Sequence, residues 1–250
     1  MPAELVEPVA YLFERYGRGM ALEREPGAGL TVACTYLPAT AIRSRVRIEI
    51  GLKLIAASAS LGAPQVRELE EGEWEGAWKA HFTLLRVGQR MVIKPSWIGY
   101  TPGDGEVVVE LDPGMAFGTG HHPTTRLCLE ALEELARPGM TVLDVGTGSG
   151  ILAIAALKLG VGHLVALDTD PVAVRVAKQN VRSNGLQARA RLARGSLPHP
   201  LVMGQEFDLV LVNINAKVIQ DKAPHLVQAV RMGGSLVASG FLEDHREQLT

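Results

Sequence analysis

The sequence is poor in cysteine, and this excludes several classes of protein. Its two cysteines, Cys34 and Cys128, form no C-x-x-C pair, so we expect neither a disulfide framework nor a zinc site. Sparse, unpaired cysteine is typical of proteins from a reducing compartment, and the predicted location is therefore the cytoplasm. No bound metal is predicted.

Strong net charge and long apolar runs are also missing. The formal net charge of -2 gives no general attraction to nucleic acids or anionic membranes. No apolar run approaches the ~20 residues that a transmembrane helix needs. The N-terminal stretch MPAELVEPVAYLFERYG is too acidic and too interrupted for a secretory signal. We therefore expect a globular protein without a nucleic-acid or membrane partner.

The chain divides into two regions and a joint. Residues 1–66 read as a small α+β domain with an N-terminal helix and a hairpin formed by MALERE and LTVACTYL. The segment AIRSRVRIEIGLKLIAA alternates like a strand, but its length favours a helix with an apolar stripe at Ile42, Val46, Ile50 and Leu54. Residues 67–83 read as a linker helix with Trp74 and Trp78 on one side. Residues 84–250 form the second domain.

Apolar strands alternate with amphipathic helices in the second domain. The strands are TVLDV, HLVAL, ARARLA, FDLVLV and SLVAS. Nearly all-apolar, β-branched strands between helices indicate a parallel sheet that is covered on both faces, so the predicted fold class is α/β and Rossmann-like. Ligands of such sheets bind at the carboxyl ends of the strands. The polar residues at those ends are therefore the candidate site residues.

The first strand ends in the glycine-rich loop DVGTGSG. Gly146, Gly148 and Gly150 permit positive φ and let the backbone approach a ligand closely. A phosphate loop is excluded because no Lys-Ser/Thr pair follows, and a dinucleotide fold needs its third glycine one residue later. The spacing D-x-G-x-G-x-G, which begins at Asp144, is instead typical of S-adenosylmethionine-dependent methyltransferases.

The other strand ends carry four further candidates. Asp168 follows an apolar strand, where its carboxylate can accept hydrogen bonds from both hydroxyls of a ribose. Asp170 stands directly before Pro171 and is assigned to the N-cap of the next helix. Ser196 is assigned to the adenine edge and Asn213 to the mouth of the same crevice. Both residues also have the alternative interpretation of simple turn residues.

At this point the chain strongly resembles the ribosomal protein methyltransferases of the PrmA family. The resemblance runs from about Pro2 to Gly240 and is carried by ELEEGEWEGAWKAHF, KPSW, LDPGMAFGTGHHPTT, LDVGTGSGILAIAALKLG, LDTDP and VNI. It implies a class I methyltransferase fold, S-adenosyl-L-methionine as cofactor, and protein-lysine N-methyltransferase activity. The implied substrate is the eleventh protein of the large ribosomal subunit, at the stalk base, which would be methylated on lysine ε-amines and/or its α-amine.

The resemblance also implies roles for particular residues. Contacts to the methyl donor are expected at Thr125, Gly146, Asp168 and Asn213, with Gly148 in the same loop. The hydroxyl of Thr125 could also cap its helix. Residues 112–125 would form a loop over the donor, with Phe117 as an apolar cover, and residues 1–66 would dock the protein substrate.

Two histidines and one asparagine of these motifs call for a chemical interpretation. His121 and His122 lack a second ligand pair at metal spacing, so they are interpreted as loop or hydrogen-bonding residues, with a catalytic base as the alternative. We expect Asn213 to accept a hydrogen bond from the substrate amine and to aim its lone pair. No dedicated general base is then required.

The chain departs from the family pattern at both ends, since it begins at the first helix and stops before the final antiparallel strands. Five core strands are therefore expected, not seven, and the chain is expected to be a monomer. Three alternatives remain. Glutamine methyltransferases of release factors and adenine methyltransferases of DNA carry N-P-P-Y where this chain has NINA. The others are a nicotinamide-dependent dehydrogenase and an inactive ribosome-binding fragment.

Overall fold

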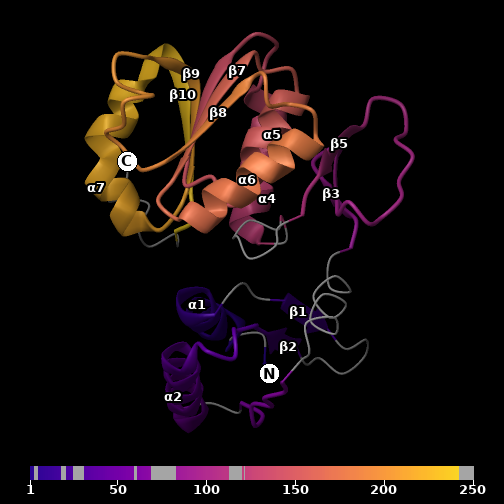
Figure 1. Ribbon diagram of the computed structural model, residues 1–250, viewed down its shortest axis with the longest axis vertical. Coiled ribbons are helices and arrows are strands. Elements are labelled where there is room, and N and C mark those ends of the chain that lie inside the picture. Colours follow the sequence, from indigo (N-terminus) through magenta and orange to yellow (C-terminus); the bar gives the residue numbers. More distant parts are fainter. Residues whose placement is uncertain are drawn as a thin grey trace. The chain divides into compact units, whose positions relative to one another are not determined.

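The chain divides into two compact units in a computed structural model (Figure 1). The structure describes residues 1–2, 5–17, 21–24, 31–58, 61–68, 83–112, 120 and 122–241. The units are Met1–Phe82 and Thr83–Thr250. Trp74 and Trp78 of the predicted linker helix lie outside the described residues, as do Phe117 and His121. In the part of the chain that is described, no helix has the length and apolar character to cross a bilayer.

The first unit pairs two helices with a β-hairpin. Helices α1 (Val6–Tyr16) and α2 (Ile42–Ser58) pack through a small apolar cluster, and Gly51 of α2 lets Leu12 of α1 approach closely. Strands β1 (Ala21–Arg24) and β2 (Thr31–Cys34) are antiparallel, which confirms the predicted hairpin.

Helix α2 confirms the secondary structure that its length predicted, but its four-residue apolar stripe is not the packed face. The members of that stripe are 45–69% exposed: Ile42, Val46, Ile50 and Leu54. The residues that face α1 are Ile48 and Leu52, which are 6% and 7% exposed. The packed face is the one beside Gly51, because a residue without a side chain allows the two helices to come together.

The second unit contains the predicted five-stranded parallel sheet. Its strands stand in the order β10-β9-β6-β7-β8. Their bounds are β6 (Thr141–Val145), β7 (His163–Asp168), β8 (Ala190–Arg194), β9 (Phe207–Asn213) and β10 (Val230–Ser239). The chain leaves the central strand β6 toward β7 on one side and reaches β9 on the other. In sheets of this kind, ligands bind beyond the carboxyl ends of the strands where the direction switches, which here are β6 and β9.

Helices cover both faces of this sheet. Helices α4 (Pro123–Leu135), α5 (Ile151–Lys158) and α6 (Pro171–Ser183) lie on one face and α7 (Ala216–Ala229) on the other (Figure 1). Neighbouring strand residues alternate between the two cores, since Val142 belongs to one buried cluster and Leu143 to the other. Helix α5 is buried along nearly its whole length, which explains its almost entirely apolar sequence.

A second sheet of three short strands was not predicted. It consists of β3 (Leu85–Val87), β4 (Met91–Lys94) and β5 (Val107–Glu110), with β3–β4 antiparallel and β4–β5 parallel. Its apolar side chains join the same buried cluster as α4 and α5. The sheet therefore belongs to the core of the second unit, and β5 leads directly to the start of the LDPG motif.

Candidate functional site

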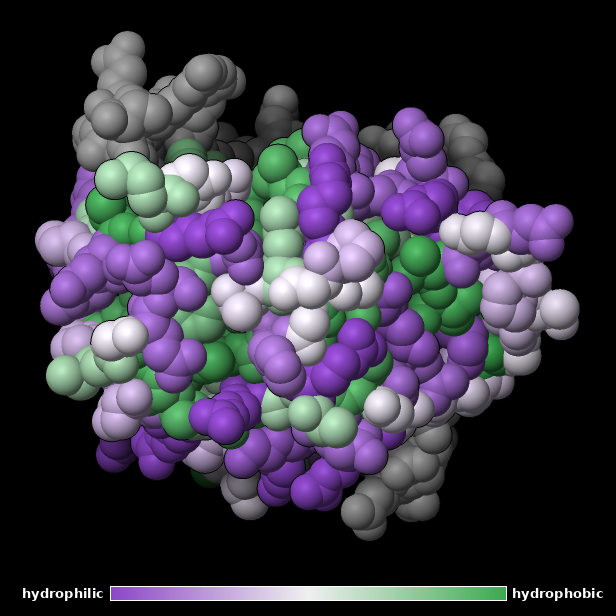
Figure 2. All heavy atoms as spheres, turned by 90° about the horizontal axis from the view of Figure 1, so that it is seen from above, coloured by the Kyte–Doolittle hydropathy of each residue, from purple (hydrophilic) through white to green (hydrophobic). Residues whose placement is uncertain are grey.

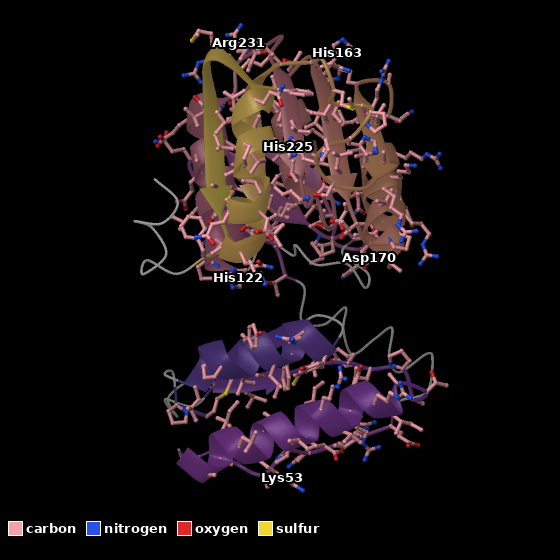
Figure 3. The ribbon with its side chains drawn as sticks, turned by 90° about the vertical axis from the view of Figure 1, so that its left-hand side faces the viewer. Lys53, His122, His163, Asp170, His225 and Arg231 are labelled. Atoms are coloured by element: carbon pink, nitrogen blue, oxygen red, sulfur yellow. The ribbon has the colours of Figure 1, made fainter. Side chains whose placement is uncertain are left out.

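The predicted site residues gather at one end of the parallel sheet. Asp170 and His122 lie at this carboxyl end, whereas His163 and Arg231 lie at the opposite end (Figure 3). The opposite end carries a mixture of hydrophilic and hydrophobic side chains (Figure 2). The polar groups at the carboxyl end are therefore the ones to test for a ligand.

The glycine loop adopts the conformation that its sequence predicted. Gly146, Gly148 and Gly150 have φ of 79°, 56° and 86°, in the left-handed region that glycine tolerates best. Neighbouring side chains also leave little room for a larger residue. A Cβ on Gly146 would collide with the Ile214 side chain, and one on Gly150 would stand 3.1 Å from the Cβ of Ala177. The loop is thus fixed both by its backbone and by its neighbours.

Asp168 and Asp170 have the separate structural settings that the sequence indicated. Asp168 Oδ2 accepts a hydrogen bond from the Gly148 N–H at 2.9 Å, and its Oδ1 accepts from the Asp170 N–H at 2.9 Å. A carboxylate has about four acceptor sites, so Asp168 keeps capacity for a ligand. Asp170 Oδ1 accepts from the Val172 N–H at 2.8 Å and caps α6, with Pro171 next in the chain, as predicted.

Thr125 and Asn213 are brought together from positions far apart in the sequence. The Asn213 Nδ2 donates to the Thr125 Oγ1 at 3.2 Å, and Thr125 is only 1% exposed. The idea that Thr125 caps its helix is wrong, because the N-cap of α4 is His122. The His122 Nδ1 accepts from the Thr124 N–H at 3.3 Å, and Pro123 fills the first helical turn. His122 is thus a hydrogen-bonding residue.

Ser196 lies next to the same strand ends. It follows Gly195, whose N–H donates to the Asp168 carbonyl oxygen at 2.8 Å. Gly195 has φ of 149°, which lets the chain turn at the end of β8. The assignment of Ser196 to an adenine edge stays a prediction.

Asp144 lies beneath the loop and is 1% exposed. Its Oδ2 accepts from the Thr147 hydroxyl at 2.6 Å, while its Oδ1 has no hydrogen-bond partner among the described residues. Burial is the main reason that the pKa of Asp144 is raised to about 7, the charge of Asp168 adds to this, and the Thr147 hydroxyl opposes it. A substantial fraction of Asp144 is therefore uncharged near neutral pH.

Two motifs that the sequence left unconnected meet at Asp112. The Ser96 N–H and hydroxyl, in KPSW, donate to the two carboxylate oxygens of Asp112 at 2.9 and 2.6 Å. The acid of the LDPG motif is thus engaged by a neighbouring loop. Within the described ranges, no cluster of three or more histidines, cysteines or acids could hold a metal ion.

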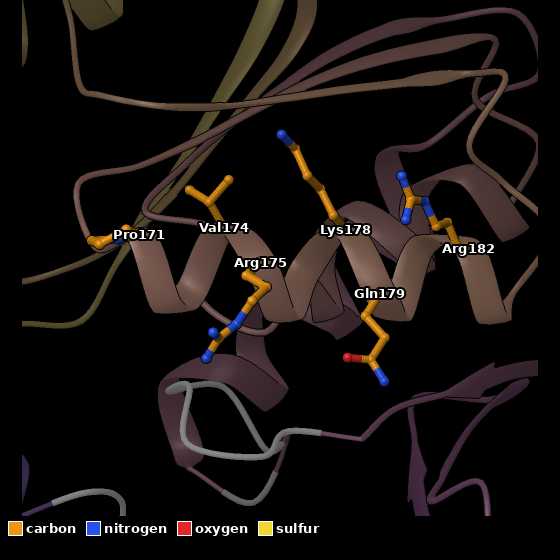
Figure 4. A pocket seen from close by; sticks show the side chains of 6 residues that line it. All are labelled: Pro171, Val174, Arg175, Lys178, Gln179 and Arg182. Atoms are coloured by element: carbon orange, nitrogen blue, oxygen red, sulfur yellow. The ribbon is translucent and has the colours of Figure 1, made fainter.

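A pocket of about 470 Å³ lies on the surface of α6 and is separate from these groups (Figure 4). It is lined by Pro171, Val174, Arg175, Lys178, Gln179 and Arg182. None of its lining residues is one of the predicted site residues. The candidate site at the strand ends is therefore identified from the hydrogen bonds between its residues and from the strand order, and not from this pocket.

The fold and the strand-end groups together define a class I S-adenosylmethionine-dependent methyltransferase. The groups present fit that cofactor. The Asp168 carboxylate, the Thr125 hydroxyl and the Asn213 amide oxygen can accept hydrogen bonds and none of these groups is a cation, which suits a ribose diol and a positively charged sulfur.

The chain belongs to the ribosomal protein L11 methyltransferase (PrmA) family, whose model matches residues 23–250. A ribosomal protein L11 methyltransferase from Chloroflexus aurantiacus is 43% identical over 279 residues, covering 96% of this chain and 85% of the relative. One from Pelotomaculum thermopropionicum is 41% identical, covering 97% and 86%. A crystal structure of the ribosomal protein L11 methylase from Lactobacillus delbrueckii subsp. bulgaricus is 31% identical with a TM-score of 0.59, covering 67% of this chain and 85% of that one.

Proposed function

We propose that this chain transfers methyl groups from S-adenosylmethionine to ribosomal protein L11, on lysine ε-amines and/or the α-amine. The observation that carries the proposal is the Asn213–Thr125 hydrogen bond at the strand-end crevice. The names of the relatives support the protein substrate. Membership of the family supports the donor.

The chemistry requires an uncharged amine that is held in line with the methyl group. When bound, the donor supplies a methyl group on a positively charged sulfur. A free lysine has a pKa of ~10.4, so only a small fraction is neutral near pH 7. A desolvated site beside a positive charge lowers that pKa and increases the neutral fraction.

Asn213 is the residue that we assign to the amine. Its Nδ2 donates to Thr125, which fixes the rotation of the amide and determines where Oδ1 points. Among the described residues, no group donates a hydrogen bond to Oδ1. Oδ1 can therefore accept an N–H of the amine and orient its lone pair, and positioning of this kind supplies a large part of many rate accelerations.

Asp168 is assigned to the ribose of the donor. Its carboxylate is held by the N–H groups of Gly148 and Asp170, so its orientation is set before a ligand arrives. A preorganised charged acceptor makes stronger hydrogen bonds than a neutral one. Gly146 and Gly148 are assigned to the backbone surface against the donor.

Residues 1–66, which lie in the first unit, are proposed to dock the protein substrate. Every residue assigned to the donor and the amine lies in the second unit, Thr83–Thr250. A separate docking region leaves that site free to accept more than one amine of the same protein.

Incubation with methyl-labelled donor and purified L11 tests the proposal, with mass spectrometry locating each methyl group. We expect label on L11 amines and none on a release factor. Label on a release-factor glutamine would support the alternative substrate, and no label on either would support the non-catalytic alternative. An Asn213→Ala chain that still binds the donor is the control for chemistry.

A further inference from the structure

Asn180 of α6 joins two segments that carry family motifs. Its Nδ2 donates to the Ser149 carbonyl oxygen at 2.9 Å and to the Asp112 carbonyl oxygen at 3.1 Å. Its Oδ1 accepts from the Asp112 N–H at 3.1 Å. The side chain is 2% exposed, and both amide protons are used. One buried amide therefore links the glycine loop to the start of the LDPG motif.

Asn184, one helical turn further on, makes a similar pair of hydrogen bonds with the backbone of β5. Its Nδ2 donates to the Glu110 carbonyl oxygen at 2.7 Å, and its Oδ1 accepts from the Glu110 N–H at 3.1 Å. Leu111 lies between Glu110 and Asp112, and its N–H donates to the carbonyl oxygen of Lys94 in β4 instead of to α6. The two amides thus bond to the end of β5 and to the residues that follow it, as a neighbouring strand would, on the edge that pairs with no other strand among the described residues.

The two asparagines differ in one respect that matters for the site. Both hold the edge of β5, but only Asn180 also contacts the glycine loop. Ser149 immediately precedes Gly150, the N-cap of α5, and the neighbouring Gly148 N–H holds the Asp168 carboxylate. On the other side, the Asp112 carboxylate is fixed by Ser96.

We propose that Asn180 is a positioning residue for the donor site. It holds the glycine loop and the backbone of Asp112 in fixed relation, so that the Gly148 N–H, which helps to orient Asp168, is in place before the donor binds. The inference rests on the proposed donor site. A purely structural role predicts that Asn180 and Asn184 contribute in the same way, and this makes Asn184 the matched control.

The test compares full-length Asn180→Ala and Asn184→Ala with the parent by amide hydrogen exchange, without any donor. In Asn180→Ala we expect faster exchange both around Glu110–Asp112 and in the loop Gly146–Gly150. In Asn184→Ala we expect faster exchange around Glu110–Asp112 alone. Unchanged exchange of the loop in Asn180→Ala would overturn the inference.

Calorimetric titration with S-adenosylhomocysteine gives the second measurement. Asn180→Ala should weaken binding by about tenfold or more, whereas Asn184→Ala should stay within about twofold of the parent. Equal losses in the two variants would overturn the positioning role. If Asn180→Ala does not fold, Asn180→Ser replaces it, because a serine hydroxyl has a single proton and cannot make both donations of the amide. A parent chain that binds no donor would contradict the proposed function instead, and hydrogen exchange would still decide whether Asn180 couples the two segments.

Discussion

The Asn213 amide donates to the Thr125 hydroxyl across a sequence separation of 88 residues, over 3.2 Å. This bond connects the end of β9 to the first turn of α4. It restricts the rotation of the Asn213 side chain and so fixes the direction in which the Oδ1 acceptor points. The orientation of Asn213 is therefore the first property to test.

Thr125→Ala should lower kcat by about fivefold, because a lost hydrogen bond of about 1 kcal/mol lets the Asn213 amide rotate. Thr125→Ser keeps the hydroxyl and should retain most of the activity. Steady-state kinetics on L11 measure both variants. Equal activity of the alanine and serine variants would contradict the orienting role of Thr125.

Asn213→Ala should lower kcat by about 100-fold, since it removes the acceptor that aims the amine. Affinity for S-adenosylhomocysteine should change much less, and calorimetry on the same preparation measures this. Near-normal turnover together with near-normal donor affinity would reject Asn213 as the catalytic group.

Asp168→Ala should weaken donor binding by at least about tenfold, because hydrogen bonds to a charged group contribute about 1.5–3 kcal/mol. Asp170→Ala is its control. It should lower stability by about 1 kcal/mol through loss of the α6 cap and affect donor affinity far less. Unchanged donor binding in Asp168→Ala would remove Asp168 from the ribose assignment.

The buried Asp144 predicts a pH-dependent stability. Because the folded pKa is raised from 3.8 to about 7, the folded chain keeps a proton that the unfolded chain has already lost in this window. Stability from this group is therefore lost as the pH rises from about 4 to about 7, and the loss then levels off. Asp144→Asn lacks this titration, so its stability relative to the parent should increase over the same window.

Urea unfolding at several pH values measures this difference. The free energy of unfolding of Asp144→Asn, relative to that of the parent, should increase by a few kcal/mol between pH 4 and pH 7, since each pKa unit corresponds to about 1.4 kcal/mol. A difference that is constant with pH, or that falls as the pH rises, would contradict the raised pKa of Asp144.

The packed face of α2 predicts unequal effects of two leucines. Leu52 is 7% exposed and Leu54 is 69% exposed. Leu52→Ala should destabilise the first unit by about 2–5 kcal/mol, whereas Leu54→Ala should change stability by less than about 0.5 kcal/mol. Thermal unfolding of both variants decides this, and a larger loss for Leu54→Ala would place the packed face on the stripe instead.

Features that are encoded in local sequence could be predicted. The five parallel strands follow from short, mostly apolar segments that alternate with amphipathic helices, and the conformation of the glycine loop follows from Gly146, Gly148 and Gly150. The cap at Asp170 follows from its place before Pro171. In each case the determining residues are neighbours in the chain.

Features that depend on distant partners could not be predicted. The strands β3, β4 and β5 have only three or four residues each, too few for a clear periodicity. The face of α2 depends on where Leu12 of α1 meets Gly51. Asn180 did leave a signal, because it falls on the buried stripe of α6 with Ala173 and Ala177. A polar residue at such a position needs buried partners.

A crystal structure of the chain with S-adenosylhomocysteine tests the central claim most directly. The account predicts both ribose hydroxyls within hydrogen-bond distance of the Asp168 carboxylate, with the glycine loop against the ligand and Asn213 at the mouth of the crevice. A ligand bound in the α6 pocket of Arg175, Lys178 and Arg182, with the strand-end crevice empty, would contradict it.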